Sequence, residues 1–369
     1  MMREMINELG RNNMSTKSRA ALLVEVNKPL IVDEIGLSDP QGGEVLVKLF
    51  ATGVCHSQLH QIHGTIPGVR LPGIIGHEGT GVVLKVGSEV THVKEGDHCM
   101  LTWVPRDAKE ESPPAPGTHF EWRGEQYPAG SCYTWSEHAL INEQFVLPMP
   151  NDISTASTSI VGCATVTGVG AVMGTAQVKE GQSVAVIGVG GVGINVIAGA
   201  KIAGANPIIA VDLIDEKLDF AKEFGATHTI NASKSDAVKE IKALTNGGAD
   251  FAFDAIGGPV TTPQSLAAVR SGRLGLDRGG VAVVVGIPQG EFTIPNFQFP
   301  FGEKSLVGSF GGSSHPDVNY PQYINWYQKG ELPLDKMVTT TYTSLDEINE
   351  AVRALEAGEI RGRSIITFE

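Results

Sequence analysis

The first part of the chain shows short apolar stretches separated by turn residues. Residues 18–32 alternate between apolar and polar positions, which predicts two short strands of a hairpin. Further strands are predicted at 43–53, at 82–86 and following 93–99, with glycine, proline or charged residues between them. Together these patterns predict a β-rich domain with many turns.

Residues 103–133 follow neither pattern. The stretch is polar, is rich in proline and glycine and has no clear period, so it is predicted to be a long surface excursion. The chain is expected to return to a strand at 134–141. Residues 157–173 contain many small side chains and are predicted to form a pair of helices around a turn that contains Cys163.

From residue 182 onward, apolar runs alternate with helical patterns. This alternation predicts a parallel, doubly wound sheet with helices between its strands. The predicted strands lie near Val184, Ile208 and His228, and at 249–254, 281–286 and 305–308. Helices are predicted at 319–330 and 345–357, the second opening with a capping box from Ser344 to Glu347, and a strand is predicted at 363–368.

One strand and helix of this region carry a chemical signal. The apolar run 184–187 is followed by Gly188, Gly190 and Gly193, in G-x-G-x-x-G spacing, and by a predicted helix at 194–203. Such glycines allow a tight turn, the approach of a pyrophosphate and close helix packing, while the helix N-terminus attracts the phosphates. Asp212 ends the next apolar run, where a carboxylate would accept from the adenosine ribose 2′-hydroxyl and repel a 2′-phosphate. The pattern favours NAD over a purely structural strand, turn and helix.

Composition narrows the classes of function. The chain has 369 residues, 41% of them hydrophobic, and a net charge of −13, which argues against nucleic acid and anionic membranes as partners. No apolar run is long enough for a transmembrane helix.

The first 14 residues lack the apolar core of a signal peptide, so a cytoplasmic protein is expected. Residues 1–17 are expected to form a disordered extension, and Met14 is an alternative start. Four cysteines in a chain of this length make no disulfide framework.

Three residues, Cys55, His77 and Cys163, are candidate metal ligands. Zinc accepts thiolate and imidazole ligands, and a catalytic zinc uses three protein ligands and keeps a fourth position for substrate or water. The three residues are far apart in the sequence, so their spacing alone does not establish a site. Each cysteine could instead be a small buried apolar residue, and His77 a hydrogen-bonded core histidine.

Several motifs, in order, resemble those of the zinc-containing alcohol dehydrogenases of the medium-chain dehydrogenase/reductase family. They are 53–57 with Cys55, 76–87 with His77, 161–168 with Cys163, the glycine motif with Asp212 and Lys217, 285–288, 309–312 and the tail 363–368. The resemblance covers the chain from about Ser18 to its end. It implies an α/β protein with a Rossmann doubly wound parallel sheet and a β-rich GroES-like catalytic domain.

The resemblance also implies where these domains and their active site lie. Residues 18–164 and 310–369 would form the GroES-like catalytic domain, and 165–309 the NAD-binding Rossmann domain, with the active site in the cleft between them. A homodimer or homotetramer is expected. The implied reaction is the reversible oxidation of an alcohol, apolar and bulky in our expectation, to an aldehyde or ketone by hydride transfer from a zinc-bound alkoxide to NAD.

Specific roles follow from the resemblance residue by residue. Cys55, His77 and Cys163 would hold one catalytic zinc per chain, and Glu78 would be the nearby acid that can approach the metal. Ser57 would accept the alcohol proton, and the cofactor's ribose hydroxyl would pass it to His60 and so to water. Glu78 keeps an alternative as a solvated or ion-paired surface glutamate, and His60 keeps one as an exposed loop histidine. Trp103 would line the substrate pocket with Ser57, although it could also be a core aromatic residue, and Trp135 is expected in the pocket wall.

The cofactor residues implied by the resemblance lie on both sides of the glycine motif. Asp212 and Lys217 would bind the adenosine ribose, His56 and Arg363 the pyrophosphate, and the apolar residues near the nicotinamide could equally be core. The full set is His56, Thr167, Gly188, Gly190, Gly191, Val192, Gly193, Asp212, Lys217, Ile256, Val285, Ile287, Phe310 and Arg363.

The chain departs from the family pattern at two places. Many members hold a structural zinc with four cysteines, but Asp107, Glu110 and Pro113 stand about where three of them would be, so no structural zinc is expected. Gln58 replaces the usual aspartate that orients the histidine ligand, which removes a negative charge behind His77.

Three other functions are alternatives to that of an alcohol dehydrogenase. A glutathione-dependent formaldehyde dehydrogenase and a non-catalytic NAD-binding protein stay open. A metal-free quinone or enone reductase of the same superfamily is opposed by Cys55, His77 and Asp212.

Overall fold

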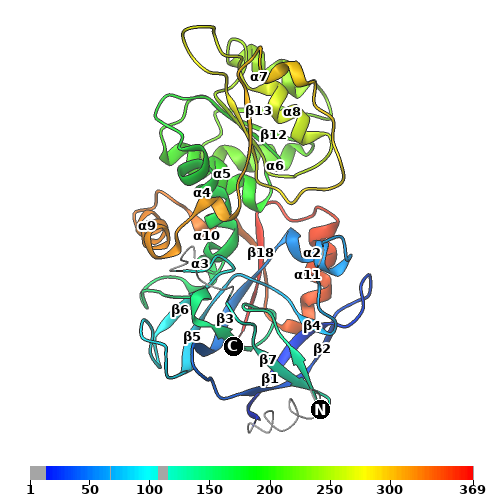
Figure 1. The fold of residues 1–369 in the computed structure, drawn as a ribbon, viewed down its shortest axis with the longest axis vertical. Coiled ribbons are helices and arrows are strands. Elements are labelled where there is room, and N and C mark those ends of the chain that lie inside the picture. Colours follow the sequence, from blue (N-terminus) through cyan, green and yellow to red (C-terminus); the bar gives the residue numbers. More distant parts are fainter. Residues whose placement is uncertain (1–13, 67, 107–114, 369) are drawn as a thin grey trace. The chain divides into compact units, whose positions relative to one another are not determined.

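A computed structural model describes residues 14–66, 68–106 and 115–368. They form two compact units, which Figure 1 colours along the sequence. Unit 1 contains the described residues up to Cys163, together with His315–Val318 and the chain from Val338 onward. Unit 2 contains Ala164–Ser314 and Asn319–Met337.

Unit 1 is built from two sheets. The first has the strand order β4-β1-β2-β7-β8, and the second has the order β10-β6-β5-β3-β18-β17 with β9 also paired to β3. The strands are β1 (Met14–Leu23), β2 (Ile31–Ser38), β3 (Glu44–Val54), β4 (Gly73–Ile74), β5 (Gly79–Val86), β6 (His98–Leu101), β7 (His119–Trp122), β8 (Glu125–Pro128), β9 (His138–Asn142), β10 (Val146–Pro148), β17 (Val338–Tyr342) and β18 (Arg363–Thr367). The β-rich domain predicted for this part of the chain is confirmed.

Short helices connect and cover these sheets. They are α2 (His56–Ile62), α3 (Thr155–Thr158), α11 (Ile348–Glu356), the 3-10 turns η1 (Glu143–Phe145) and η6 (Leu345–Glu347), and the π-helical turn η2 (Val161–Thr165), which ends in unit 2. The predicted capping box is present, because the Ser344 hydroxyl accepts from the first turn while Glu347 accepts from the backbone of Ser344. Helix α11 packs against α2 (Figure 1). A buried apolar cluster that includes Trp135 and Ile366 belongs to the same unit.

The N-terminal boundary lies earlier than the sequence pattern indicated. Residues 14–17 were assigned to a disordered extension, but they belong to β1, where Lys17 is paired with Gly36 of β2. The sequence shows no apolar pattern in this part of the strand, because its order comes from backbone pairing with β2. Residues 1–13 of the expected extension lie outside the described residues.

The stretch 103–133 is not an irregular excursion throughout. Strands β7 and β8 form an antiparallel hairpin within it, and Gly36 of β2 pairs with Glu121 of β7. Phe120 and Tyr133 are fully buried, and the Tyr133 hydroxyl accepts a hydrogen bond from the Leu140 amide. The strands are short and flanked by turn residues, so only their packing against the rest of unit 1 reveals them.

Residues 157–173 do not form a helix pair around a turn. One helical stretch runs from Thr155 to Ala176, and Cys163 lies within its π-helical turn. The small residues of this stretch permit close packing, because a Cβ atom at Gly162 would lie 2.0 Å from the Leu101 carbonyl oxygen. By length and composition this stretch could span a membrane, but 78% of its most apolar window is buried inside the protein, as in a core helix.

Unit 2 contains the predicted doubly wound sheet. Its six strands are all parallel and follow the order β13-β12-β11-β14-β15-β16, the order of a dinucleotide-binding fold. They are β11 (Val184–Ile187), β12 (Ile208–Asp212), β13 (His228–Asn231), β14 (Phe251–Asp254), β15 (Val281–Val284) and β16 (Ser305–Gly308). Each lies where the sequence predicted it, and the central strands β11, β12 and β14 are apolar runs buried on both faces, whereas the edge strands β13 and β16 are partly exposed.

Helices follow most of these strands. They are α4 (Val166–Gly170), α5 (Gly191–Ile202), α6 (Asp215–Phe224), α7 (Ala237–Leu244), α8 (Thr261–Ala268) and α10 (Leu334–Met337), with the π-helical turn η3 (Ala171–Ala176) and the 3-10 turns η4 (Asn296–Gln298) and η5 (Gly311–Ser313). Helix α9 (Pro316–Gln328) begins in unit 1 and continues in unit 2.

The expected return to the catalytic domain at residue 310 needs correction. Residues 310–314 and 319–337 belong to unit 2, and only 315–318 and the chain from Val338 belong to unit 1. Two contacts explain this division: the hydroxyls of Ser314 and Tyr323 lie 3.2 Å apart, and Lys336 forms an ion pair with Glu223 of α6. The helices near the C-terminus therefore complete the unit that carries the parallel sheet.

Candidate active site

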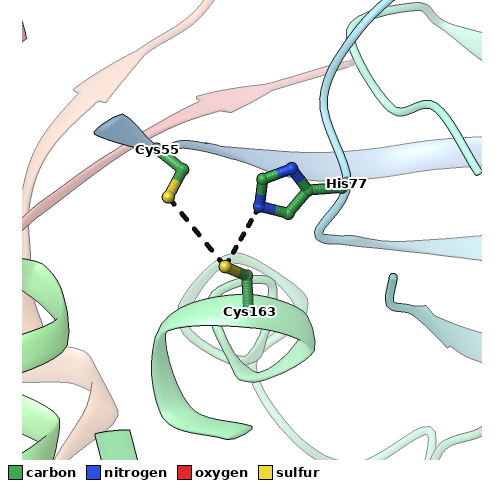
Figure 2. Close-up of side chains that lie close together, drawn as sticks. All are labelled: Cys55, His77 and Cys163. Atoms are coloured by element: carbon green, nitrogen blue, oxygen red, sulfur yellow. Dashed lines mark hydrogen bonds between the residues drawn. The ribbon is translucent and has the colours of Figure 1, made fainter. Parts of the chain in front are cut away.

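Unit 1 brings Cys55, His77 and Cys163 together from three separate parts of the chain (Figure 2). Cys55 follows β3 and caps the N-terminus of α2, His77 follows β4, and Cys163 lies in η2. The Cys55 and Cys163 sulfurs are 3.9 Å apart, and His77 Nε2 is 3.0 Å from the Cys163 sulfur. All three ligand atoms lie within 4.8 Å of one another.

This donor set fits a zinc ion. Zinc bonds of ordinary length at a tetrahedral centre place two sulfurs about 3.8 Å apart, and a nitrogen and a sulfur about 3.6 Å apart. The sulfur pair already has that spacing, and the His77 ring needs to move only slightly away from Cys163. Two thiols and one imidazole with a fourth position left over are the ligands of a catalytic zinc rather than a structural one.

The two thiols influence each other's ionisation. The hydrogen bond from Cys163 lowers the pKa of Cys55 well below that of a free thiol, and the Arg363 charge adds to this effect. The same bond raises the pKa of Cys163. One thiolate, at Cys55, is thus stabilised inside the protein, which favours binding of a cation.

Two side chains of α2 contact the His77 ring. Gln58 is buried, and its Nε2 lies 2.5 Å from His77 Nδ1 while its Oε1 accepts a hydrogen bond of 2.9 Å from the Cys55 amide. The Ser57 hydroxyl lies on the other side of the ring, 3.4 Å from Nε2. Helix α2 therefore positions both the back of the imidazole and a hydroxyl beside the metal-binding atom.

Glu78 and Arg363 form a buried ion pair behind the cluster. The Arg363 guanidinium donates to one Glu78 oxygen through Nε, at 3.0 Å, and through Nη2, and both side chains are almost completely buried. Burial raises the pKa of Glu78 while the guanidinium lowers it. Burial lowers the pKa of Arg363, but the charges of Cys55 and Glu78 raise it, so this side chain stays positive. Glu78 is therefore not the ordinary surface glutamate of the alternative interpretation.

The remaining unit 1 residues of the predicted site lie near this cluster or in the core. His60 lies on α2 within 2.9 Å of the Thr65 hydroxyl, His56 is exposed on the same helix, and the Trp103 ring is 6.3 Å from the His77 ring. Burial and the neighbouring His56 lower the pKa of His60, so its ring is neutral at pH 7. Trp135 was expected in the pocket wall, but it is fully buried and donates to the Gly53 carbonyl, so it belongs to the core.

The glycine motif of unit 2 has the form that pyrophosphate binding requires. Gly188 has a positive φ of 86°, and a Cβ atom at Gly193 would lie 1.9 Å from the Gly188 carbonyl oxygen. A Cβ at Gly190 would meet nothing within 4 Å. No side chain caps the N-terminus of α5, so its first amides can bind an anion.

Asp212 ends β12 beside this turn. One carboxylate oxygen accepts from the Val189 amide at 2.9 Å, and the other accepts from the amides of Leu213 and Ile214. These bonds hold the carboxylate next to the glycine motif and leave lone pairs for a ribose hydroxyl. Lys217 is half-buried in the first turn of α6.

The apolar cofactor candidates of unit 2 are not ordinary core residues. Val192, Val285 and Ile287 are partly exposed, while Ile256 and Phe310 are 44% and 85% exposed. Thr167 is buried, and its hydroxyl has no hydrogen-bond partner among the described residues. An unpartnered buried hydroxyl and exposed apolar side chains fit a site that a bound NAD would complete.

Asp254 was missed by sequence reasoning. It is fully buried at the end of β14, where one oxygen accepts from the amides of Ile256 and Gly257 and the other accepts from the Thr262 hydroxyl. It holds the loop that places Ile256 against Gly188. Its position, an aspartate at the end of an apolar run as at Asp212, is the signal that could have identified it.

Comparisons with known proteins agree with this geometry. Residues 41–151 match the family model of the alcohol dehydrogenase GroES-like domain, and residues 191–329 match that of the zinc-binding dehydrogenases. The chain is 35% identical to an alcohol dehydrogenase class-3 of Cereibacter sphaeroides and to an S-(hydroxymethyl)glutathione dehydrogenase of Paracoccus denitrificans, each over 95% of this chain and 100% of the relative. The crystal structure of benzyl alcohol dehydrogenase from Acinetobacter calcoaceticus matches with a TM-score of 0.85 and 29% identity, over 96% of this chain and 100% of that one.

These similarities confirm the family resemblance, the fold class and the cofactors zinc and NAD. Residues 107–114, where a structural zinc was not expected, lie outside the described residues, so that expectation stays a prediction. The chain therefore belongs to the zinc-dependent alcohol dehydrogenases and is an NAD-dependent oxidoreductase that acts on alcohols.

Proposed function

We propose that Cys55, His77 and Cys163 hold the catalytic zinc of this enzyme and that its substrate is an apolar, bulky alcohol. The observation that carries the proposal is the meeting of two thiols and one imidazole within 4.8 Å. A zinc ion bound there supplies a Lewis acid that lowers the pKa of an alcohol hydroxyl and stabilises negative charge on its oxygen.

The protein's own residues handle the proton. The Ser57 hydroxyl lies beside the metal-binding face of His77 and can accept the alcohol proton through its oxygen lone pairs. His60, one turn further along α2, is half-buried, and burial and His56 lower its pKa, so the ring is neutral and has a free lone pair that can receive the proton in passing. Ser57 and His60 are thus the two protein groups of the proposed proton relay, which the ribose hydroxyl of NAD would join.

Residues of unit 2 bind NAD. The turn from Gly188 to Gly193 and the amides at the start of α5 receive the pyrophosphate, and Asp212 receives the adenosine ribose and rejects a 2′-phosphate. The nicotinamide end is surrounded by one hydroxyl-bearing and five apolar side chains, those of Thr167, Val192, Ile256, Val285, Ile287 and Phe310. The expected roles of His56, Lys217 and Arg363 toward NAD stay predictions, and so do the cytoplasmic location and the dimer or tetramer.

The substrate class rests on two observations. Trp103 lies next to His77 and offers an aromatic surface beside the zinc ligands. The structural relative with a TM-score of 0.85 is named for benzyl alcohol. The name S-(hydroxymethyl)glutathione dehydrogenase of a sequence relative provides the alternative, the adduct of formaldehyde with glutathione.

The first experiment measures NADH formation with short, long-chain, cyclic and aromatic alcohols, and with formaldehyde plus glutathione. We expect turnover to be highest with aromatic or other bulky apolar alcohols and to be lost when zinc is removed by a chelator. Turnover of formaldehyde only in the presence of glutathione, without turnover of any alcohol, would replace the proposed substrate with the alternative.

Matched variants identify the zinc ligands. Cys163→Ser should lose its bound zinc. Its kcat/KM should fall by about 100-fold or more, because the metal no longer lowers the pKa of the alcohol. Cys132→Ser alters a cysteine that lies outside the cluster, and it should keep both zinc and activity. Equal zinc content in the two variants would reject the ligand assignment.

A further inference from the structure

We propose that the carboxamide of Gln58 cannot accept from both the Cys55 N–H and the imidazole N–H of a metal-bound His77, and that this conflict makes the chain hold its zinc less tightly than a carboxylate at the same position would allow. The inference rests on the proposed zinc site and adds a positioning role for Gln58, a side chain that is 1% exposed. It is carried by two contacts that use the two ends of one amide group.

The first contact assigns the ends of the amide. Gln58 Oε1 accepts a hydrogen bond from the Cys55 backbone N–H at 2.9 Å. The other end of the carboxamide, Nε2, therefore faces His77 Nδ1 at 2.5 Å. Because an amide nitrogen is only a donor, a hydrogen bond between these two atoms requires Nδ1 to accept.

In this arrangement the Cys55 amide donates to Gln58, and Gln58 donates to His77. The single acceptor of the carboxamide is therefore already used by the backbone of Cys55, and its donor end faces the imidazole.

Metal binding reverses the requirement at His77. An imidazole that binds zinc through Nε2 carries its proton on Nδ1 and needs an acceptor there. The Gln58 amide can offer its oxygen to Nδ1 only by exchanging its two ends, and its nitrogen then faces the N–H of Cys55. In either orientation the Gln58 nitrogen faces another buried donor, the N–H of His77 or that of Cys55. That N–H then loses its hydrogen bond.

A carboxylate in the same position would not meet this conflict. Both of its oxygens are acceptors, so a glutamate at position 58 could accept from the Cys55 N–H and from Nδ1–H of His77 together. Partners of this kind behind a metal ligand are worth about 10-fold to 100-fold in metal affinity. We expect Gln58→Glu to bind zinc at least about 10-fold more tightly than the natural chain.

The test uses the full zinc-loaded chain and a chromophoric chelator, and it measures the affinity and the release rate of zinc without any turnover assay. Gln58→Glu is compared with the natural chain and with Gln61→Glu, which adds the same charge to the same helix but lies outside the contacts of His77. Tighter zinc binding by Gln58→Glu alone is expected. Equal affinity of all three proteins, or an equal gain in both variants, would overturn the inference while leaving the zinc site intact.

A measurement on the natural chain covers the case in which a variant does not fold. Nitrogen-15 NMR of labelled histidine distinguishes a protonated from an unprotonated Nδ1. We expect Nδ1 of His77 to be unprotonated in the metal-free protein and protonated after zinc is added. A proton on Nδ1 already present in the metal-free protein at neutral ring charge would overturn the inference, whereas failure of the natural chain to bind zinc at all would overturn both it and the proposed function.

Discussion

At the scale of single residues, the buried pair of Glu78 and Arg363 links the loop that carries His77 to the last strand. The glutamate directly follows His77, and the arginine begins β18, 285 positions later. Burying a charge is unfavourable unless it is paired. Separating the two side chains would therefore leave two buried, unpaired charges at a high cost in free energy. Gly53 leaves room for this pair, because a Cβ atom there would lie 2.2 Å from a Glu78 oxygen.

Removal of one member should therefore be costly. Glu78→Gln leaves the Arg363 guanidinium buried without its carboxylate, and we expect the free energy of unfolding to fall by about 3–5 kcal/mol. Urea unfolding of the metal-free protein measures this without a contribution from zinc. As a control, Glu350→Gln breaks the exposed pair with Arg353 and should leave the stability unchanged. If the two variants unfold alike, the buried pair does not have the assigned role.

At the scale of elements, the turn between β11 and α5 contains one glycine that the fold requires and another that matters for ligand binding. At Gly193 a side chain would collide with the backbone of Gly188, whereas at Gly190 it would enter open space. Gly190 also has ordinary backbone angles, with φ of −75° and ψ of −162°. The absence of a side chain at Gly190 therefore matters for a ligand that approaches the turn.

Two alanine variants make this difference measurable. Gly190→Ala should unfold at the same temperature as the natural chain but bind NADH at least about 10-fold more weakly, because the new methyl group takes the place of the pyrophosphate. Gly193→Ala should lower the unfolding temperature as well as binding. Fluorescence titration of NADH and thermal unfolding provide the two readouts. Unchanged NADH binding by Gly190→Ala would show that the pyrophosphate does not approach this turn.

At the scale of the whole molecule, each unit carries its own chemistry. The three proposed zinc ligands all lie in unit 1, and the glycine motif with Asp212 lies in unit 2. Each unit also has its own buried apolar clusters: Leu22, Val47 and Phe120 belong to one in unit 1, and Ile187 and Ile209 belong to one in unit 2. A ligand that binds one native unit stabilises that unit by mass action.

Removal of the metal should accordingly affect unit 1 alone. We expect hydrogen exchange to become faster at the start of α2, at residues 76–78 and in η2, where the ligands would no longer be joined. Exchange in β11–β16 should stay the same. Hydrogen-exchange mass spectrometry of the zinc-loaded and chelated protein checks this, and faster exchange throughout the parallel sheet would contradict the assignment of the metal's effect to unit 1.

Local sequence patterns were enough for unit 2. Its central strands are apolar runs buried on both faces, and the glycines, the following helix and Asp212 stand at fixed short distances from them in the sequence. Such features depend on neighbours within about 30 residues, which the sequence displays directly. For the zinc ligands, spacing alone left the alternatives open, and the family resemblance was needed to select Cys55, His77 and Cys163.

By itself the sequence determined the parallel sheet, the NAD motif and, through resemblance, the family. Only the tertiary structure decided that β7 and β8 form a hairpin inside a proline-rich stretch, that Cys163 lies in a continuous helical stretch, and that Trp135 is core. It also decided that Gln58 faces His77 with its nitrogen, because the Cys55 amide occupies its oxygen. Each of these outcomes depends on contacts between residues far apart in the chain or on the direction of a hydrogen bond, and neither leaves a periodic trace in the sequence.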